Sequence, residues 1–319
     1  MSGAGGRLVA VTGATGFLGR QVVAELARRG WRLRLLVRSQ PLHPLWQQLE
    51  PELVLGSLAD RRALDRLVAG ADAVLHLAGL IKARDRAEFL QVNRDGSRAL
   101  AEAVREHAPA AQLLLVSSLA AREPGLSDYG ASKRAGEEVA FEVLGHARVS
   151  VIRPPAIYGP GDRETLVFFQ LARGRLIPLL GGPRARMALI HVEDAAAALA
   201  DRLEAGPSGR VQAIADGRPQ GYGWRQILAA GAEAVGNRRP RYFQVPAAAL
   251  KTGGWLAGSL AKLAGQAAML GPGKVRELLH EDWGLSADEL WRAPGTGPAH
   301  GLQDGFASTA DWYRQAGWL

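Results

Sequence analysis

A tyrosine and a lysine four residues apart, with a serine upstream, form the most reactive combination in this sequence. Tyr129 and Lys133 would share one face of a helix. A nearby ammonium favours the phenolate and lowers the pKa of a tyrosine toward neutrality. Tyr129 could then donate or accept a proton at a carbonyl or carbinol. Ser118 follows the apolar run 113–116, and its hydroxyl could hydrogen-bond the same oxygen.

A glycine-rich stretch near the start of the chain is suited to binding a phosphate. Gly13, Gly16 and Gly19 follow the apolar run 8–11 and precede a segment with helical spacing, 21–29. Glycines let the backbone approach a pyrophosphate, whose charge is favoured at a helix N-terminus. This position between a strand and a helix predicts a dinucleotide-binding loop.

Arg38, which follows the second predicted strand (33–37), bears on which dinucleotide is bound. Sites that prefer NAD place an acidic residue here to accept hydrogen bonds from the ribose. An arginine cannot accept, but it can pair with the 2′-phosphate of NADP. The sequence therefore favours NADP(H) over NAD(H). The alternative is that Arg38 is one of many solvated surface arginines.

Strand-like and helical segments alternate through the first half of the chain and must position these residues. The strand-like runs are 8–11, 33–37, 53–55, 73–77, 113–116 and 149–152, with helical segments near 60–69, 86–106 and 130–144. This alternation predicts an α/β fold with a Rossmann-like, doubly wound parallel sheet in a domain of residues 1–155. We expect 156–319 to form a smaller, helix-rich, substrate-binding lobe, with segments returning to the first domain.

Composition and charge exclude several classes of site and partner. The absence of cysteine excludes disulfides, thiolate nucleophiles and Cys-ligated metals, and the histidines lack metal-ligand spacing, so we expect no metal. The net charge of +8 could attract nucleic acid, anionic lipid or a phosphorylated ligand. The arginines are scattered in blocks no longer than two, which argues against nucleic acid. Without a signal peptide or a long apolar run, the sequence predicts a cytoplasmic protein.

These features together resemble the extended short-chain dehydrogenase/reductases, the NAD-dependent epimerase/dehydratase-like family. The resemblance covers nearly the whole chain. It rests on the glycine loop, Leu77-Ala78-Gly79, Val92-Asn93, Ser117-Ser118, Tyr129-x-x-x-Lys133, the run Arg153 to Pro160, and His191-Val192-Glu193-Asp194. It implies that Ser118, Tyr129 and Lys133 are catalytic, that Lys133 also binds the nicotinamide ribose, and that the run 153–160 borders the nicotinamide.

The resemblance also extends the set of expected cofactor contacts. The full set is Gly13, Thr15, Gly16, Phe17, Leu18, Gly19, Arg38, Ser57, Leu58, Leu77, Ala78, Gly79, Asn93, Val116, Tyr129, Lys133, Pro154, Ala156 and Ile157. Two features depart from the family pattern. Ser57 stands where the family has an adenine-contacting Asp, and the interval from Ser118 to Tyr129 is shorter than in most sugar-modifying members.

Three activities within the family compete. Sugar dehydratases carry an Asp-Glu pair after the catalytic hydroxyl, whereas Leu119 and Ala120 follow Ser118 here, which argues against dehydration. Nucleotide-sugar epimerases retain NAD, and Arg38 argues against them without excluding them. Reductases of apolar, lipid-like ketones use NADP(H) and fit best. A non-enzymatic reading, an NADPH-binding scaffold or regulatory subunit, also stays open, although such relatives usually lose the Tyr or the Lys.

An apolar stripe in the segment 247–270 supports a lipid-like substrate. Leu256, Leu260, Leu263, Ala267 and Leu270 recur at helical spacing, beside Trp255. Such a helix could roof a hydrophobic pocket or lie on a membrane surface, or it could be an ordinary packed amphipathic helix. The stretch resembles the C-terminal lobe of bacterial family members that reduce a long-chain keto-lipid, such as ceramide reductases. Relatives often dimerise, so a homodimer is a further expectation.

Overall fold

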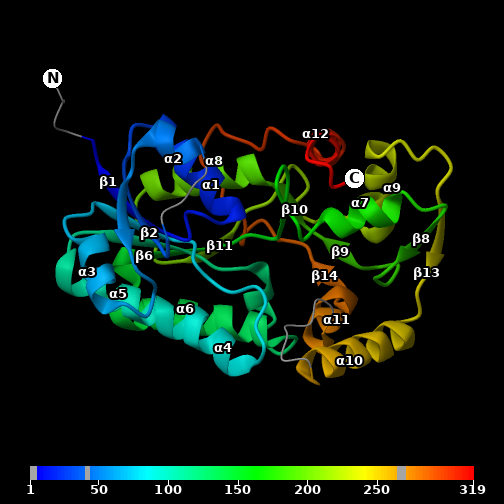
Figure 1. The fold of residues 1–319 in the computed structure, drawn as a ribbon, viewed down its shortest axis with the longest axis horizontal. Helices are drawn as coiled ribbons and strands as arrows, with labels where there is room; N and C mark the ends of the chain where they lie inside the picture. Colours follow the sequence, from blue (N-terminus) through cyan, green and yellow to red (C-terminus); the bar gives the residue numbers. More distant parts are fainter. Residues whose placement is uncertain (1–5, 40–43, 264–270) are drawn as a thin grey trace. The chain divides into compact units, whose positions relative to one another are not determined.

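The computed structural model describes residues 6–39, 44–263 and 271–319, with the side chains of 44 and 258–263 left out. The chain divides into two compact units, which we describe separately (Figure 1). The first contains Met1–Pro124, Asp128–Arg153 and Ala196–Gln212. The second contains Gly125–Ser127, Pro154–Ala195 and Ala213–Leu319.

A seven-stranded parallel sheet forms the centre of the first unit and confirms the predicted Rossmann-like fold class. Its strands lie in the order β11-β6-β5-β4-β1-β2-β3. They are β1 (Leu8–Thr12), β2 (Arg32–Val37), β3 (Glu52–Leu55), β4 (Ala73–His76), β5 (Gln112–Val116), β6 (Val149–Arg153) and β11 (Val211–Ala213). The central strands β1 and β4 are buried along their whole length, as expected for strands covered on both faces.

Helices cover both faces of this sheet. The helices α3 (Arg61–Val68), α5 (Gly96–His107) and α6 (Asp128–Leu144) lie on one side, and α1 (Phe17–Arg28) and α8 (Val192–Glu204) on the other (Figure 1). Apolar residues of α3 and α5 form one buried cluster with those of β1, β4 and β5. Short helices α2 (Pro44–Leu49) and α4 (Arg86–Leu90) complete this unit.

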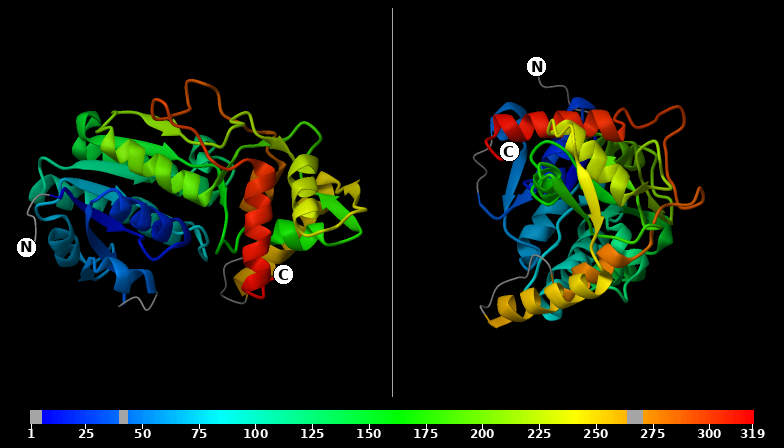
Figure 2. Two further views of the ribbon diagram at one scale, coloured as in Figure 1. Left: turned by 90° about the horizontal axis from the view of Figure 1, so that it is seen from above. Right: turned by 90° about the vertical axis from the view of Figure 1, so that its right-hand side faces the viewer.

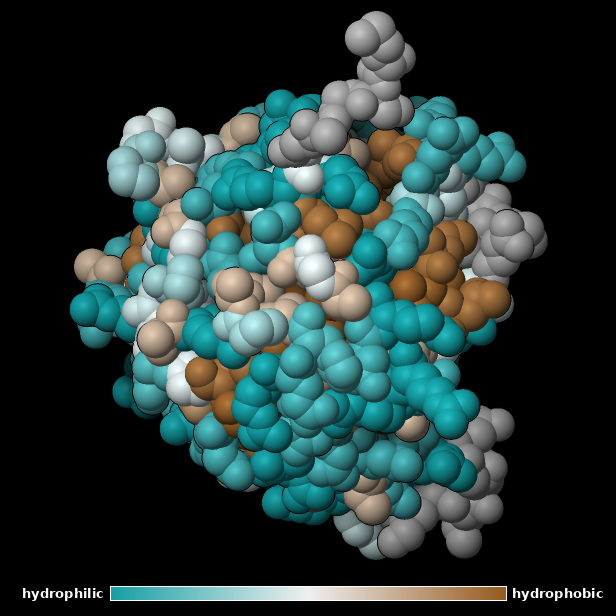
Figure 3. Space-filling model, turned by 90° about the vertical axis from the view of Figure 1, so that its left-hand side faces the viewer, coloured by the Kyte–Doolittle hydropathy of each residue, from teal (hydrophilic) through white to brown (hydrophobic). Residues whose placement is uncertain are grey.

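Ion pairs join several of these helices at the surface. Arg29, at the end of α1, pairs with Asp201 and Glu204 of α8 at 2.6 and 2.8 Å. Figure 3 shows an end view in which hydrophilic side chains predominate and apolar patches are small and separated. The ion pairs of Arg29 connect the end of α1 to α8 across the surface of the first unit.

The second unit combines small sheets with helices around an aromatic core. Parallel pairs are β7 (Ala156–Tyr158) with β10 (Leu189–His191), and β8 (Leu176–Leu179) with β13 (Arg241–Gln244). A third sheet contains β9 (Arg186–Met187), β12 (Tyr222–Gly223) and β14 (Asp282–Trp283). The helices are α7 (Leu166–Ala172), α9 (Trp224–Ala234), α10 (Ala247–Leu263), α11 (Pro272–Leu279) and α12 (Leu302–Gln315) (Figure 2).

Four aromatic side chains fill the centre of the second unit. Tyr158, Phe169, Phe306 and Tyr313 are fully buried, and their rings meet at 4.9–5.2 Å between centroids. Gly305 of α12 lies against the Tyr158 ring, where a Cβ would come within 2.3 Å of the hydroxyl oxygen. None of the helices within the described ranges combines the length and the apolar character that crossing a membrane would require.

Candidate active site

The glycine loop between β1 and α1 is shaped so that side chains cannot fill it. Gly13 has φ +75°, and a Cβ there would lie 2.6 Å from the Ala78 nitrogen. A Cβ at Gly19 would lie 2.1 Å from the Gly13 carbonyl oxygen. Gly16 is the N-cap of α1 and offers no side-chain cap to the first backbone N–H groups of the helix. These donors are left for an anion, which is what a dinucleotide pyrophosphate supplies.

The other expected cofactor residues of the first unit follow the carboxyl ends of its parallel strands. Thr15 is exposed in the glycine loop, and Phe17 and Leu18 open α1 half-buried. Arg38 is exposed directly after β2. After β3, the Ser57 hydroxyl accepts a hydrogen bond from Ala59 N at 3.3 Å. Leu58 packs on the apolar cluster of the sheet and helices.

Contacts between glycines and their neighbours bring several of these residues together. Leu77 and Ala78 pass directly behind Gly13. A Cβ at Gly79 would lie 3.0 Å from Asn93 Oδ1 and 3.4 Å from Lys133 Nζ. Lys133 Nζ in turn donates to the carbonyl oxygen of Val116, at the end of β5, at 2.8 Å. The glycine loop, the segment after β4 and Lys133 are therefore neighbours within one unit.

The start of α6, which carries Tyr129 and Lys133, and the turn capped by Ser118 are held by local contacts. The helix α6 begins at Asp128, so Tyr129 and Lys133 lie in its first two turns. The Tyr129 ring packs at 6.0 Å from that of Phe89 on α4. Ser118 caps the 3₁₀ turn Leu119–Arg122, its oxygen accepting from Ala120 N at 3.2 Å. Since Ser118 Oγ acts there as an acceptor, its hydroxyl hydrogen can be donated to a substrate oxygen.

The environment of Lys133 lowers the pKa of its ammonium. Desolvation by the surrounding protein lowers the pKa of Lys133 to about 8, against the opposing effect of the Glu137 carboxylate. Glu137 is itself almost fully buried and forms a two-pronged ion pair with Arg153 at the end of β6. An ammonium that is poorly solvated interacts more strongly with a neighbouring phenolate than one in water.

Asn93 holds the loop after β4 against α6. It lies in a π-helical turn, Gln91–Asp95, between α4 and α5. Its Oδ1 accepts from Leu80 N at 2.8 Å, and its Nδ2 donates to Leu80 O at 3.0 Å and to Ser132 Oγ at 2.9 Å. Ser132 donates to the carbonyl oxygen of Tyr129 at 2.8 Å. π-turns often mark functional sites, and here the turn aims an amide at the helix that carries Tyr129.

His76 extends this network to the phosphate loop, a connection that the sequence analysis missed. Its Nδ1 lies 2.6 Å from Thr12 Oγ1, and its Nε2 lies 3.0 Å from Ser97 Oγ. Ser97 donates to Asn93 O, so Ser97 Oγ is left to accept from a protonated Nε2. Thr12 then donates to Nδ1, which fixes one neutral tautomer. Burial, helped by the Lys133 charge, lowers the pKa of His76 to about 3, in keeping with a neutral ring.

Asn93→Ala tests whether this network supports the fold. The change removes the acceptor for Leu80 N and the donor to Leu80 O and Ser132 Oγ, although Ser132 still donates to Tyr129 O. We expect the free energy of unfolding to fall by about 1–3 kcal/mol, measured by urea denaturation. Arg94→Ala, an exposed neighbour on the same turn, should change it by no more than about 0.5 kcal/mol. Equal stability of Asn93→Ala and the parent would show that the amide bonds are dispensable.

The remaining expected cofactor residues, Pro154, Ala156 and Ile157, belong to the second unit. Ala156 and Ile157 lie in β7, in register with Leu189 and Ile190 of β10. The contacts described above join the glycine loop to Leu77 and Ala78, and Gly79 to Asn93 and Lys133. The roles of all the expected cofactor residues, these three included, stay predictions.

Two histidines and a glutamate of the second unit form the one group within the described ranges with the composition of a metal site. His191, Glu193 and His300 place one ligand atom each within 4.8 Å of one another. The two imidazole rings are stacked with centroids 3.9 Å apart and planes at 28°. In stacked rings the nitrogen lone pairs point side by side and do not converge on one ion. This geometry does not favour a metal ion at these three residues.

The chain is similar to known proteins in sequence and in fold. Residues 9–215 match the model of the NAD dependent epimerase/dehydratase family. A ceramide reductase of Caulobacter vibrioides is 50% identical over 313 residues, which cover 98% of this chain and 96% of that protein. A farnesyl-dihydroquinoline-oxide ketoreductase of Stigmatella aurantiaca is 29% identical over 66% of this chain and 68% of its own.

Solved structures share the fold at lower sequence identity. The crystal structure of gox2253 aligns with a TM-score of 0.76 at 22% identity, covering 99% of this chain and 100% of the other. A putative epimerase from Burkholderia cenocepacia aligns with a TM-score of 0.73 at 24% identity, covering 97% and 98%. These structural matches establish the fold and not the substrate.

Proposed function

The chain belongs to the NAD-dependent epimerase/dehydratase family, and from that premise we propose that it reduces a ketone of a ceramide-like lipid with NADPH. The observation that carries this proposal is the 50% identity, along almost the entire chain, to a protein named ceramide reductase. The intact set of Ser118, Tyr129 and Lys133 supports an enzyme over a scaffold. Ser118 and Lys133 are held by hydrogen bonds, and the Tyr129 ring packs on Phe89.

The glycine cradle fits a dinucleotide. Gly13 and Gly19 leave free the space that a Cβ would fill, and the N-terminus of α1 faces the loop without a side-chain cap. When bound, the nicotinamide supplies or accepts a hydride. Gly13, Gly16 and Gly19 would hold the pyrophosphate, and Lys133, beside Gly79, would hold the nicotinamide ribose, as the family resemblance implies.

The side chains of Ser118, Tyr129 and Lys133 would supply the proton that the ketone oxygen needs. In reduction, the ketone carbon gains a hydride, and its oxygen must gain a proton to give the alcohol. Ser118 donates a hydrogen bond that orients and polarises the ketone oxygen. Tyr129 delivers the proton to that oxygen, and the Lys133 ammonium stabilises the phenolate that remains. In the oxidation direction the same groups act in reverse.

Arg38→Asp tests the proposed preference for NADPH. The change removes a charge-assisted partner for the 2′-phosphate and supplies an acceptor for the free ribose hydroxyl. We expect the ratio of NADH affinity to NADPH affinity, from fluorescence titration, to rise by about 10- to 100-fold. Arg32→Asp, at the opposite end of the same strand, is the matched control and should leave the ratio unchanged. Equal affinities for NADH and NADPH in the unmutated protein would contradict the role of Arg38.

A peripheral position at the inner face of the membrane follows from a lipid substrate. Within the segment 247–270, Trp255 and Leu256 of α10 are 62% and 50% exposed. Leu260, Leu263, Ala267 and Leu270 of the expected stripe lie outside the described side chains. Large apolar side chains left in solvent on a helix support contact with lipid. The homodimer expected from relatives stays a prediction.

NADPH oxidation with two substrate panels tests the activity directly. We expect absorbance loss at the nicotinamide band with detergent-dispersed keto-ceramides, faster for long acyl chains than for short ones, and none with nucleotide sugars. Turnover of a nucleotide sugar without any apolar ketone would replace this proposal with the epimerase reading. Tight NADPH binding with no turnover of either panel would favour a scaffold.

A further inference from the structure

Two long segments of the second unit contain no acidic residue. None lies between Glu164 and Glu193, and none between Glu233 and Glu277, although the chain carries 31 aspartates and glutamates. The parallel pairing of β8 with β13 brings these two segments side by side. Where they meet, Arg241 N donates to Arg175 O at 3.0 Å. The fold therefore gathers the basic residues of both segments where neither provides a carboxylate.

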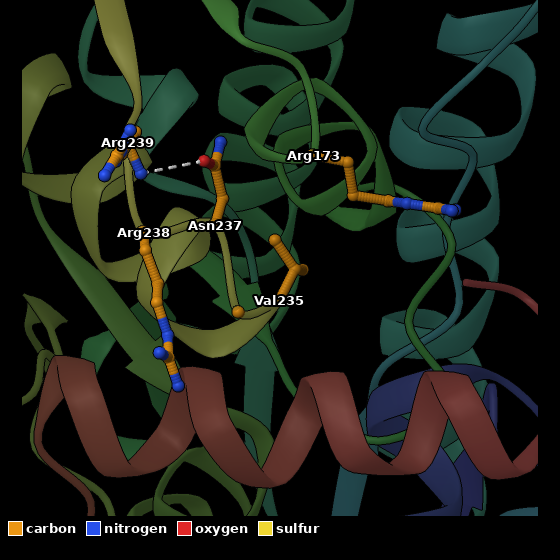
Figure 4. Close-up of a pocket in the computed structure, with 6 residues that line it drawn as sticks. Arg173, Val235, Asn237, Arg238 and Arg239 are labelled. Atoms are coloured by element: carbon orange, nitrogen blue, oxygen red, sulfur yellow. Dashed lines mark hydrogen bonds between the residues drawn. The ribbon is translucent and has the colours of Figure 1, made fainter.

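Five exposed arginines surround this strand pair. They are Arg173, Arg175, Arg238, Arg239 and Arg241. Arg173, Arg238 and Arg239 line one surface depression together with Val235 and Asn237 (Figure 4). In the part of the chain that the structure describes, none of the five forms an ion pair with an acidic residue.

Arginines elsewhere in the molecule behave differently. In the first unit, Arg61 contacts Asp65, Glu102 and Glu106. Arg98 pairs with Glu142 at 2.8 Å. An arginine-rich composition therefore does not by itself leave arginines unpaired, and the cluster around β8 and β13 is a local property of the second unit.

Apolar side chains are exposed within the same cluster. Leu176 is 64% exposed and Phe243 is 47% exposed. Because Leu176 lies opposite Arg241 in the register, and Phe243 is two residues further on, all three share the outer face of the strand pair. On the inner face, Ile177 is fully buried in the aromatic core.

The arrangement of the arginines indicates a partner with many anionic groups spread over a surface rather than a single bound anion. Figure 4 shows the side chains of Arg173, Arg238 and Arg239 extending in different directions from the depression. One phosphate bound in a pocket would need guanidinium groups that converge on it. Charges spread around exposed leucine and phenylalanine side chains match a plane of anionic headgroups over an apolar layer.

We propose that the outer face of β8 and β13, with the loop 235–241, docks on an anionic lipid bilayer. This proposal rests on the proposed function, since a ceramide-like substrate resides in a membrane. The arginines contact the headgroups, and Leu176 and Phe243 insert among them. A second copy of the chain is a poorer partner, because a two-fold contact of this face with itself would set its arginines against one another. β13 is followed along the chain by α10 (Figure 1), whose Trp255 and Leu256 are also exposed.

Vesicle sedimentation of the full chain tests the surface. The vesicles contain phosphatidylcholine alone or with about 30% phosphatidylglycerol. We expect the protein to sediment only with the anionic vesicles and to be released by high salt. The charge reversal Arg238→Glu/Arg239→Glu/Arg241→Glu should weaken the binding by at least about 100-fold. Leu176→Ser/Phe243→Ser, which leaves the charge unchanged, should also weaken the binding measured at low salt.

A matched variant separates this surface from net charge alone. Arg28→Glu/Arg94→Glu/Arg98→Glu makes the same charge change on exposed, acid-paired arginines of the first unit, and it should retain most of the binding. An equal loss in both triple variants, or no loss in the first, would overturn the proposal. Retention of single-stranded RNA in preference to vesicles would also overturn it.

Turnover of a detergent-dispersed ketone distinguishes failure of this proposal from failure of the proposed function. The docking variants should keep parental rates on dispersed substrate and lose rate only on substrate held in anionic vesicles. Vesicle binding without turnover of any ketone would support the docking surface and contradict the proposed reductase activity. Ketone turnover without binding to anionic vesicles would support the reductase activity and contradict the docking surface.

Discussion

Tyr129→Phe should reduce turnover by about 10²–10⁴-fold while NADPH affinity changes little. The substitution removes the hydroxyl that delivers the proton and keeps the ring, which packs against Phe89 of α4 at 6.0 Å. The backbone contact between Tyr129 O and Ser132 is unaffected, since it uses no side-chain atom of the tyrosine. Turnover is measured by NADPH oxidation with a keto-lipid, and affinity by titration of the cofactor fluorescence.

The control for this change is a tyrosine of the second unit to which no role in the chemistry is assigned. Tyr242→Phe alters a partly buried tyrosine of β13, whose ring lies 5.3 Å from the Arg225 guanidinium, and it should leave turnover near the parental value. A Tyr129→Phe enzyme with parental turnover would falsify the assignment of the proton donor.

The alternation of strands and helices in the first half of the chain could be predicted from the sequence, because each element shows a local pattern of apolar residues. Parallel strands such as β1 and β4 are buried on both faces, so they appear as short apolar runs between helical segments. The glycine loop was equally readable, since only glycine tolerates the approach of the backbone to Leu77 and Ala78 at Gly13. The fold class therefore followed from periodicity and from a few positions with steric constraints.

The hydrogen bonds that support the site could not be predicted from the sequence in the same way. His76 ends an apolar strand, and nothing in its neighbours along the chain indicates that it joins Thr12 to Ser97. For Asn93 the sequence predicted a cofactor contact, which stays a prediction, but it gave no sign of the hydrogen bonds from its amide to Leu80 and Ser132. Such networks join residues from 13 to 64 positions apart, so only the packing of β4, α5 and α6 reveals them.

The cluster of arginines around β8 and β13 was likewise not predicted from the sequence. Along the chain the arginines never form a block longer than two, and a focused basic face was not expected. The pairing of β8 with β13 places residues about 65 positions apart side by side, as Arg241 and Leu176 illustrate. Clustering of charge is a tertiary property here, although the two acid-free segments were a signal that could have been found in the sequence.

Lys133→Met should produce a second large effect, with loss of both turnover and cofactor affinity. The ammonium is needed to stabilise the Tyr129 phenolate, and its position beside Gly79 fits contact with the nicotinamide ribose. We expect turnover to fall by at least about 10²-fold, and NADPH affinity to fall by about 10-fold, as for the loss of one charged hydrogen bond. Both are measured as for Tyr129→Phe, with Lys251→Met on the exposed part of α10 as the control.

The pH dependence of turnover and of stability distinguishes loss of the Lys133 ammonium from simple misfolding of the variant. Desolvation lowers the pKa of Lys133 to about 8 in the folded chain, below its value in the unfolded chain. Reduction by the parent should therefore decline as the pH rises through about 8, and Lys133→Met should lack that step. For stability the sign is opposite: the buried ammonium opposes folding below pH 8, and this penalty is relieved as the pH rises from about 8 toward the unfolded pKa. At pH 7 the Met variant should then unfold at the same or a higher urea concentration while remaining nearly inactive. A variant that is inactive because it is less stable, with the parental pH step retained in its residual activity, would contradict the catalytic role of Lys133.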